Sequence, residues 1–203
     1  MKLFISGIGT EIGKTVVSAV FTEALKADYW KPVQAGELDH TDSMKVKALI
    51  SNSESYIHAE AYRLLNPLSP HAAAEMEGIE IEEDSIQIPQ TKRNLIIEGA
   101  GGLMVPINRK FMMVDLIRRL GAEVVLVSRN YLGSINHTLM SIALLKQYEI
   151  PIKGIVFNGI PTPSSESLIL EYSNLPCLLR IKEEEKINSD TILKYAEALN
   201  PFA

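Results

Sequence analysis

The sequence has one cysteine, Cys177, and one tryptophan, and aromatic residues make up only 6% of its 203 residues. A single cysteine excludes a disulfide within the chain and is typical of proteins in a reducing compartment. No apolar run reaches about 18 residues, the length that a membrane-spanning helix requires. The chain also opens without a cationic leader and a following apolar run. We therefore expect a cytoplasmic protein with no membrane partner.

The sequence also has no excess of positive charge. Its 20 Lys and Arg residues against 25 Asp and Glu residues give a net charge of −5, which does not favour a nucleic-acid partner. We expect Lys45 and Lys47 to lie on a solvated helix face, and Cys177, in an apolar Pro-Cys-Leu-Leu run, to be a packed thiol. The length fits a single domain over 1–203 with a core large enough for a sheet.

Short β-branched runs alternate with amphipathic segments along the chain. Strands are predicted at 2–7, 28–33, 94–98, 123–128, 152–158 and 177–181, and helices at 14–27, 42–50, 113–120, 135–148, 165–173 and 190–199. The continuous apolar runs of the strands are typical of burial on both faces. The alternation predicts an α/β fold, a single-domain doubly wound, mostly parallel sheet flanked by helices. Segment 51–92 breaks the pattern, and we expect an excursion above the sheet with a short helix after His71.

The most informative segment is Lys2–Val17, KLFISGIGTEIGKTVV. It reads as an apolar strand, a loop with glycines at 7, 9 and 13, and a helix that opens on Lys14-Thr15. Glycines let backbone N–H groups turn toward an anion, the helix N-terminus favours negative charge, and lysine reaches the outer phosphates. The spacing Gly7-x5-Gly-Lys-Thr is one residue longer than the usual G-x4-G-K-[ST]. A dinucleotide loop is the rival, but its third glycine would fall one position earlier, so we favour a nucleoside triphosphate.

Other polar residues follow the remaining predicted strands. Lys31, Glu98 and Asn158 stand at three strand ends, where parallel sheets bind ligands. A single lysine could simply cap a surface strand, but Lys14 and Lys31 at neighbouring ends could flank one anion. Glu98 is well placed to hold Mg²⁺, although it could instead cap backbone. Asp42 would most often be a helix N-cap, so it is the weakest of the metal candidates.

Six motifs occur together, in one order, along nearly the whole chain. They are GIGTEIGKT at 7–15, KPVQAG at 31–36, SPHAAAE at 69–75, EGAGG at 98–102, LGSINH at 132–137 and VFNG at 156–159. With them, the chain resembles the dethiobiotin synthetase family. The resemblance implies a P-loop NTPase type of fold and a homodimer. It also implies Mg²⁺- and ATP-dependent closure of a cyclic urea from 7,8-diaminononanoate and CO2, which yields dethiobiotin, ADP and phosphate in biotin biosynthesis.

The resemblance also implies roles for individual residues. Lys14 and Lys31 would hold the carbamate and the transferring phosphate, and Thr10 would contact the carbamate end. Mg²⁺ would be bound by Thr15, Asp42 and Glu98. The implied ATP contacts are Glu11, Ile12, Gly13, Lys14, Thr15, Val16, Asp42, Glu98, Gly99, Ala100, Gly101, Asn158 and Gly159. Asn158 would read the adenine edge, with the loop at 181–185 closing over the base. The implied substrate contacts are Thr10, Lys31, Ala35, Gly133, Ser134 and Asn136, and part of this set would come from the other subunit.

Three positions depart from the family pattern. Ala35 lacks the hydroxyl that often contacts substrate, Gly9 replaces a common aspartate, and Lys182 replaces a frequent proline in the loop over the base. We expect His71 and His137 to be structural. The alternative function is a partitioning or positioning switch ATPase, but such loops carry a lysine four residues before the final glycine, where this chain has Gly9. A nucleotide-binding protein without catalysis is a third option.

Overall fold

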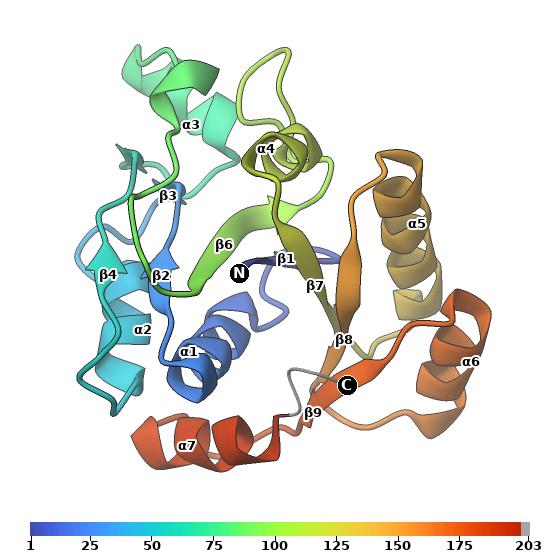
Figure 1. Cartoon of the computed structure of the whole chain (residues 1–203). Helices are drawn as coiled ribbons and strands as arrows, with labels where there is room; N and C mark the ends of the chain where they lie inside the picture. The colour runs from blue at the N-terminus through green and yellow to red at the C-terminus, as the bar shows by residue number, and fades with distance from the viewer. Residues whose placement is uncertain (200–203) are drawn as a thin grey trace.

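The computed structural model describes residues 1–199, and a parallel sheet of seven strands lies at its centre (Figure 1). The strands in spatial order are β4 (Ile57–His58), β2 (Asp28–Trp30), β6 (Leu95–Gly102), β1 (Lys2–Gly7), β7 (Glu123–Arg129), β8 (Ile152–Asn158) and β9 (Cys177–Ile181). Each neighbouring pair is parallel. The chain starts at the centre, builds one side, returns to β6 and then builds the other side. This is the predicted doubly wound α/β fold; the last four residues of the predicted domain lie outside the described residues.

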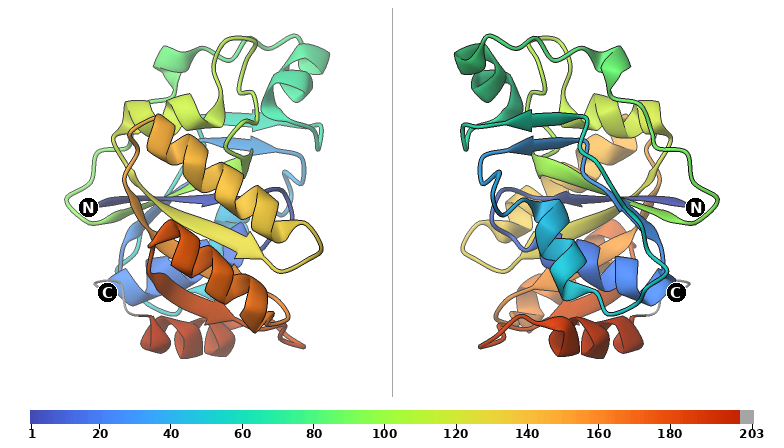
Figure 2. Two further views of the ribbon diagram at one scale, coloured as in Figure 1. Left: turned by 90° about the vertical axis from the view of Figure 1, so that its right-hand side faces the viewer. Right: turned by 90° about the vertical axis from the view of Figure 1, so that its left-hand side faces the viewer.

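Helices cover both faces of the sheet (Figures 1 and 2). One face carries α4 (Met113–Leu120), α5 (Ser134–Gln147) and α6 (Pro163–Ser173), and the other carries α1 (Lys14–Leu25), α2 (Asp42–Leu49) and α7 (Ser189–Ala198). Successive residues of β1 serve opposite layers: Phe4 belongs to the first core, whereas Leu3 and Ile5 belong to the second. Because strand side chains alternate between faces, a strand with two cores reads as a continuous apolar run.

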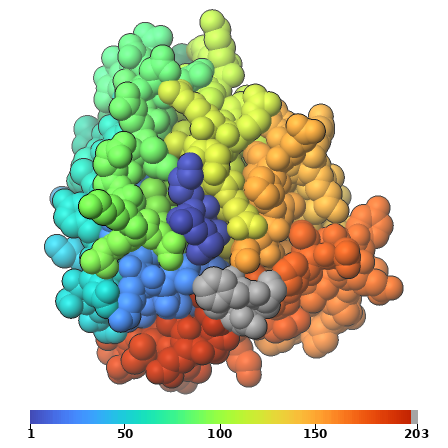
Figure 3. All heavy atoms as spheres, in the orientation of Figure 1, coloured from blue at the N-terminus to red at the C-terminus, as the bar shows by residue number. Residues whose placement is uncertain are grey.

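The parallel strands bring their carboxyl ends to one edge of the molecule. In Figure 2, β1 runs from the N-terminus toward the loops on the opposite side. Figure 3 views the end where β1 begins, with the first residues (blue) reaching the surface between the segments that precede β6 and β7. β1 lies between β6 and β7, where the direction of sheet building reverses. Ligands of doubly wound proteins bind at the carboxyl side of this point.

Most element bounds agree with the sequence predictions. Strands 2–7, 152–158 and 177–181 have the predicted bounds, strand 123–128 is one residue longer, and the six predicted helices agree to within about two residues, the usual scatter of helix ends. The predicted strand 94–98 is too short, because β6 continues through the glycines to Gly102. The prediction of one strand over 28–33 is wrong. β2 ends at Trp30, and Pro32, which has no N–H to donate, separates it from β3 (Val33–Ala35). β3 pairs with β5 (Tyr62–Leu64) in a second, two-stranded sheet.

Segment 51–92 contains more structure than the sequence predicted. The short helix expected after His71 is present as α3 (Pro70–Glu77), and η1 (Glu83–Ser85) is a single 3-10 turn. The strands β4 and β5, of two and three residues, were not predicted because they are too short to show a period. Within residues 1–199, no helix combines the length and the apolar character needed to cross a membrane.

Candidate functional site

Three carbonyl groups of the loop between β1 and α1 are held by side chains. Lys14 Nζ donates to the Gly9 carbonyl at 2.8 Å, Arg129 Nη1 to the Glu11 carbonyl at 3.2 Å, and Asn158 Nδ2 to the Ile12 carbonyl at 2.7 Å. Because a peptide's N–H points opposite to its C=O, the bonds from Arg129 and Asn158, which lie outside the cavity lining, favour N–H groups that turn toward the cavity, whereas the Gly9 carbonyl accepts from the cavity lysine. Gly13, at φ 90°, is the N-cap of α1 and provides no side-chain cap. The loop therefore has the features of an anion site at a helix N-terminus.

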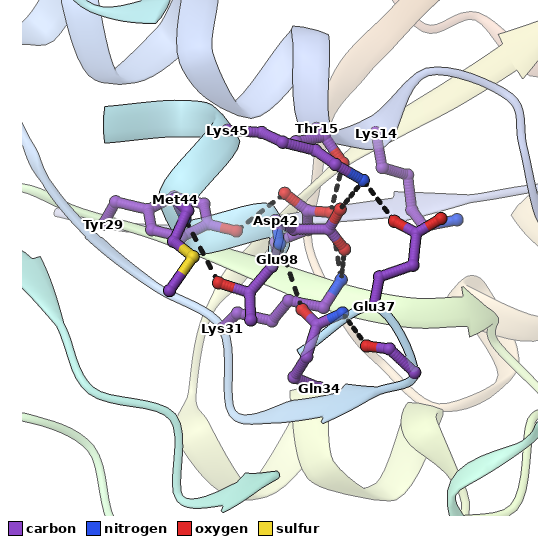
Figure 4. A network of polar contacts seen from close by, with 12 residues as sticks. Lys14, Thr15, Tyr29, Lys31, Gln34, Glu37, Asp42, Met44, Lys45 and Glu98 are labelled. Atoms are coloured by element: carbon purple, nitrogen blue, oxygen red, sulfur yellow. Dashed lines mark hydrogen bonds and ion pairs between the residues drawn. The ribbon is translucent and has the colours of Figure 1, made fainter. Parts of the chain in front are cut away.

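Lys31 joins the three predicted metal ligands into one cluster (Figure 4). Its ammonium donates to Asp42 Oδ2 and, at 3.1 Å, to Glu98 Oε1. Thr15 Oγ1 donates to the same Glu98 oxygen at 2.9 Å. Lys31 is 5% exposed and Glu98 1% exposed, so this ion pair is buried. Residues from α1, β6, α2 and the end of β2 thus meet at one point, as the sequence predicted.

Burial and charge set the protonation of the two lysines differently. Burial lowers the pKa of Lys14 to about 8, a shift that Glu98 opposes and the Lys31 ammonium strengthens. Burial also lowers the pKa of Lys31, but the Glu98 and Asp42 carboxylates more than offset this, and its pKa is raised. Burial alone would raise the pKa of the Asp42 carboxyl, but Lys31, with Lys45 and Thr15, more than offsets this, so the pKa is lowered. Lys31 therefore stays protonated, whereas Lys14, with its lowered pKa, can lose its proton in mildly alkaline solution.

Two buried residues that the sequence analysis did not single out orient the carboxylates. The Tyr29 hydroxyl donates to Glu98 Oε2 at 2.9 Å. Gln34 Oε1 accepts from the Asp42 backbone N–H at 3.2 Å, while its Nε2 donates to the Gly36 carbonyl at 3.0 Å. Sequence separation hides the Tyr29 contact, because it follows from the pairing of β2 with β6. Nothing in the sequence around Gln34, in KPVQAG, indicated its contact with the backbone of Asp42.

A cavity of about 600 Å³ opens above this cluster. The predicted site residues that line it are Thr10, Glu11, Gly13, Lys14, Thr15, Lys31, Ala35, Asp42, Glu98, Ala100 and Gly101. Pro67, Leu68 and Val105 add apolar walls. Lys14 and Lys31, which come from different strand ends, thus face one space. Lys45 also lines this cavity with a side chain that is 42% exposed, and Lys47 is exposed as expected.

Other predicted residues lie outside that cavity lining. Ile12 and Gly99 are packing positions: Ile12 is 4% exposed in the core, and a Cβ at Gly99 would lie 2.7 Å from the Phe4 ring. Val16 is half-buried in the first turn of α1. Asn158 Nδ2 donates one hydrogen to the Ile12 carbonyl of the phosphate loop, so the predicted contact with an adenine edge would use its second amide hydrogen and its oxygen. Gly159 continues this strand end with its N–H on the Ile181 carbonyl.

The segment Gly133–Asn136 lies apart from the lysines. Gly133, Ser134 and Asn136 line a separate cavity of about 870 Å³ beside Tyr131 and Ile160. Within one chain, the structure does not bring them to Lys31.

The two histidines singled out in the sequence have local partners. His71 Nδ1 lies 3.0 Å from Ser69 Oγ, and His137 Nδ1 lies 2.7 Å from the Tyr131 hydroxyl. His71 lines a different cavity, with Glu75 and Ile79. These contacts fit the structural roles expected for both residues. Among the residues that the structure describes, no group of three or more His, Cys, Asp or Glu side chains is arranged to hold a metal ion.

The fold and the loop define a P-loop nucleoside triphosphatase, and comparisons with known proteins agree. A family model described as an AAA domain matches residues 1–191. A ParA family ATPase from Chlorobium tepidum TLS superposes with a TM-score of 0.59 over 97% of this chain and 99% of that one, at 16% identity, which shows the fold alone.

The chain belongs to the dethiobiotin synthetase family. The ATP-dependent dethiobiotin synthetase BioD of Christiangramia forsetii is 52% identical over 96% of this chain and 93% of its own length. The protein of the same name from Cytophaga hutchinsonii is 52% identical over 98% and 96%.

Proposed function

We propose that this protein is an ATP-dependent dethiobiotin synthetase, a carbon–nitrogen cyclo-ligase that makes dethiobiotin from 7,8-diaminononanoate and CO2. The observation that carries the proposal is the single cavity shared by the ammonium groups of Lys14 and Lys31 and by the oxygens of Thr15, Asp42 and Glu98. Such a cavity can hold a triphosphate and a second anion together. The names of the relatives, 52% identical over nearly the full chain, support this choice.

The chemistry requires positioning and neutralisation of charge. One substrate amine adds to CO2 and loses a proton to give a carbamate. A carbamate oxygen then attacks the γ-phosphorus and ADP leaves. The second amine attacks the resulting carbamic–phosphoric anhydride, expels phosphate and closes the ring. Lys14 and Lys31 would neutralise the phosphoryl oxygens, and the Thr10 hydroxyl would hold the carbamate. Such electrostatic preorganisation is the main contribution of proteins to phosphoryl transfer.

The oxygens of this cluster fit a magnesium ion. A hydroxyl from Thr15 and carboxylates from Asp42 and Glu98 are the hard donors that Mg²⁺ prefers, and Lys31 holds both carboxylates in place. When bound, the ion would neutralise charge on the outer phosphates. Backbone N–H groups from Glu11 to Val16 would hold the phosphates, with Ala100 and Gly101 forming part of the cavity wall. Asn158 would fix the loop with one amide hydrogen and would keep its second amide hydrogen and its oxygen for the base.

The separate position of Gly133–Asn136 supports a homodimer. In one chain this segment is remote from Lys31, yet its helix N-terminus, with Ser134 and Asn136, suits a carboxylate. We propose that it binds the substrate tail held in the partner's cavity. Leu132 is fully exposed beside it and Tyr131 is 44% exposed, an apolar surface that a second copy could cover. We place the enzyme in the cytoplasm, where ATP is available.

Phosphate release tests the proposal against a switch ATPase. Strict dependence on both the diamine and bicarbonate, with dethiobiotin detected by mass spectrometry, is expected. ATP hydrolysis at full rate without the diamine would instead favour the switch. Lys31→Gln is expected to abolish most phosphate release while nucleotide binding is largely retained. Lys47→Gln, on the exposed side of α2, is the matched control and is expected to match the wild type.

A further inference from the structure

Two more charged residues face the cavity of Lys14 and Lys31 and have no role in the reaction described above. Lys45 lies one turn after Asp42 on α2, and its Nζ is 2.5 Å from Glu37 Oε2 and 3.5 Å from Asp42 Oδ1. Both Lys45 and Glu37 line the cavity. Figure 4 shows the Lys45 ammonium and the Glu37 carboxylate meeting close to the cluster of Asp42. Lys45 therefore brings a third ammonium group to the cavity.

This third ammonium can change partners more easily than the other two. The side chains of Lys45 and Glu37 are 42% and 64% exposed, whereas that of Lys31 is 6% exposed and bonded to two carboxylates. Lys14 is buried and donates to a carbonyl of its own loop. Ion pairs between exposed side chains contribute little stability, so exchanging one partner for another anion costs little. The Lys45 ammonium can thus exchange Glu37 for an anion that enters the cavity.

From this arrangement we propose that Lys45 is a nucleotide-binding residue, which leaves Glu37 when ATP enters and pairs with the terminal phosphate. The inference rests on the proposed function, because it takes ATP as the ligand of this cavity. Glu37 then has the opposite effect: it occupies Lys45 and adds negative charge at the rim, so it weakens triphosphate binding. Together, Lys45 and Glu37 set the preference for ATP over ADP, since only ATP carries the γ-phosphate with which Lys45 would pair.

Calorimetric titration of the full chain with the β,γ-imido analogue of ATP and with ADP, each with magnesium, tests this. Lys45→Met is expected to weaken binding of the analogue about tenfold, the effect of losing one partly exposed charged hydrogen bond, and to change ADP binding less than about twofold. Glu37→Gln is expected to tighten binding of the analogue, and less so in the Lys45→Met background. Lys45→Arg keeps the charge and is expected to keep the preference. Lys47→Met, on the same helix but outside the cavity, is the control and is expected to match the wild type.

Three outcomes would overturn the proposal. Equal weakening of the analogue and ADP would give Lys45 a general structural role, and unchanged binding of the analogue would exclude it from the site. A raised KM for the diamine in Glu37→Gln, with nucleotide binding unchanged, would make Glu37 a contact of the substrate amine instead. If the wild type binds neither nucleotide, the proposed function itself fails, and that result is distinct from all three.

Discussion

Replacing Lys31 with methionine is the sharpest test of how the site is held together. The substitution keeps much of the side-chain length and removes the ammonium that binds Glu98 and Asp42. Glu98 is then a 1% exposed carboxylate whose remaining partners are the hydroxyls of Thr15 and Tyr29. Removing one member of a buried ion pair costs about 3–5 kcal/mol. We expect about 3 kcal/mol, because the Asp42 side chain is 19% exposed and keeps Lys45 nearby.

Urea unfolding of the ligand-free protein measures this loss of unfolding free energy. In thermal unfolding of a chain of this size, each kcal/mol shifts the melting temperature by about 2–4 °C, so the melting temperature is expected to fall by about 6–12 °C. The double variant Lys31→Met/Glu98→Gln is expected to recover part of the stability, because it no longer buries an unpaired charge. Excess magnesium is expected to recover part of it in Lys31→Met alone, since a divalent cation can replace the lost charge. Lys47→Met is the control, with an effect within about 0.5 kcal/mol.

The reasoning is refuted if Lys31→Met is as stable as the wild type. It is equally refuted if the double variant is less stable than the single one, because the cost would then come from lost packing and not from charge. The stabilities of the single and double variants thus distinguish a loss of stability caused by unpaired charge from one caused by lost packing.

Four further effects are expected, two on changing the pH and two on substitution. Since burial lowers the pKa of Lys14 to about 8, ATP affinity should fall by up to about tenfold per unit as the pH rises above this value. An ATP affinity that does not change with pH would contradict this, and Lys14→Arg is expected to show such a constant affinity. Folding stability should rise between about pH 8 and 10.5, where the unfolded chain still binds the proton that the folded chain has lost. Tyr29→Phe leaves a buried Glu98 oxygen without its donor and should cost about 1–3 kcal/mol in urea unfolding; an unchanged midpoint would show that the hydroxyl contributes nothing. In Gly13→Ala the new Cβ would lie 2.2 Å from Asn158 Nδ2 at φ 90°, so calorimetry should detect at least a roughly tenfold loss of ATP affinity, and wild-type affinity would exclude a tight loop.

The features that the sequence predicted well are local or periodic. The strands with two buried faces are recognisable because each is a continuous apolar run, and the phosphate loop because its glycines and Lys14-Thr15 are adjacent in the chain. The cluster of strand-end residues also followed, since parallel strands place their carboxyl ends at one edge. These signals were enough to bring Lys14, Lys31 and Glu98 together without knowledge of their contacts, whereas Asp42 was added by the family resemblance.

The features that it missed depend on register between distant segments. Glu98 is 67 residues from Lys31 and 69 from Tyr29, and neither bond can be read without the pairing of β2 with β6. The end of β2 was missed although Pro32 marks it, because the predicted strand was extended across Lys31 and Pro32 to the apolar Val33. The place of Lys45 in the cavity lining was also missed, because a helix alone does not show which of its polar faces borders a cavity.

The extra residue of the phosphate loop also has a physical explanation. Ile12 turns back beneath the loop and is 4% exposed; a Cβ on Gly7 would lie 2.2 Å from its Cδ1. Glu11 adopts φ 56°, the left-handed conformation needed to make that turn. The added position thus anchors the loop in the core below, while Asn158 holds the Ile12 carbonyl from the side. A loop fixed at these points loses little freedom when it binds phosphate, so the longer spacing is compatible with a preorganised anion site.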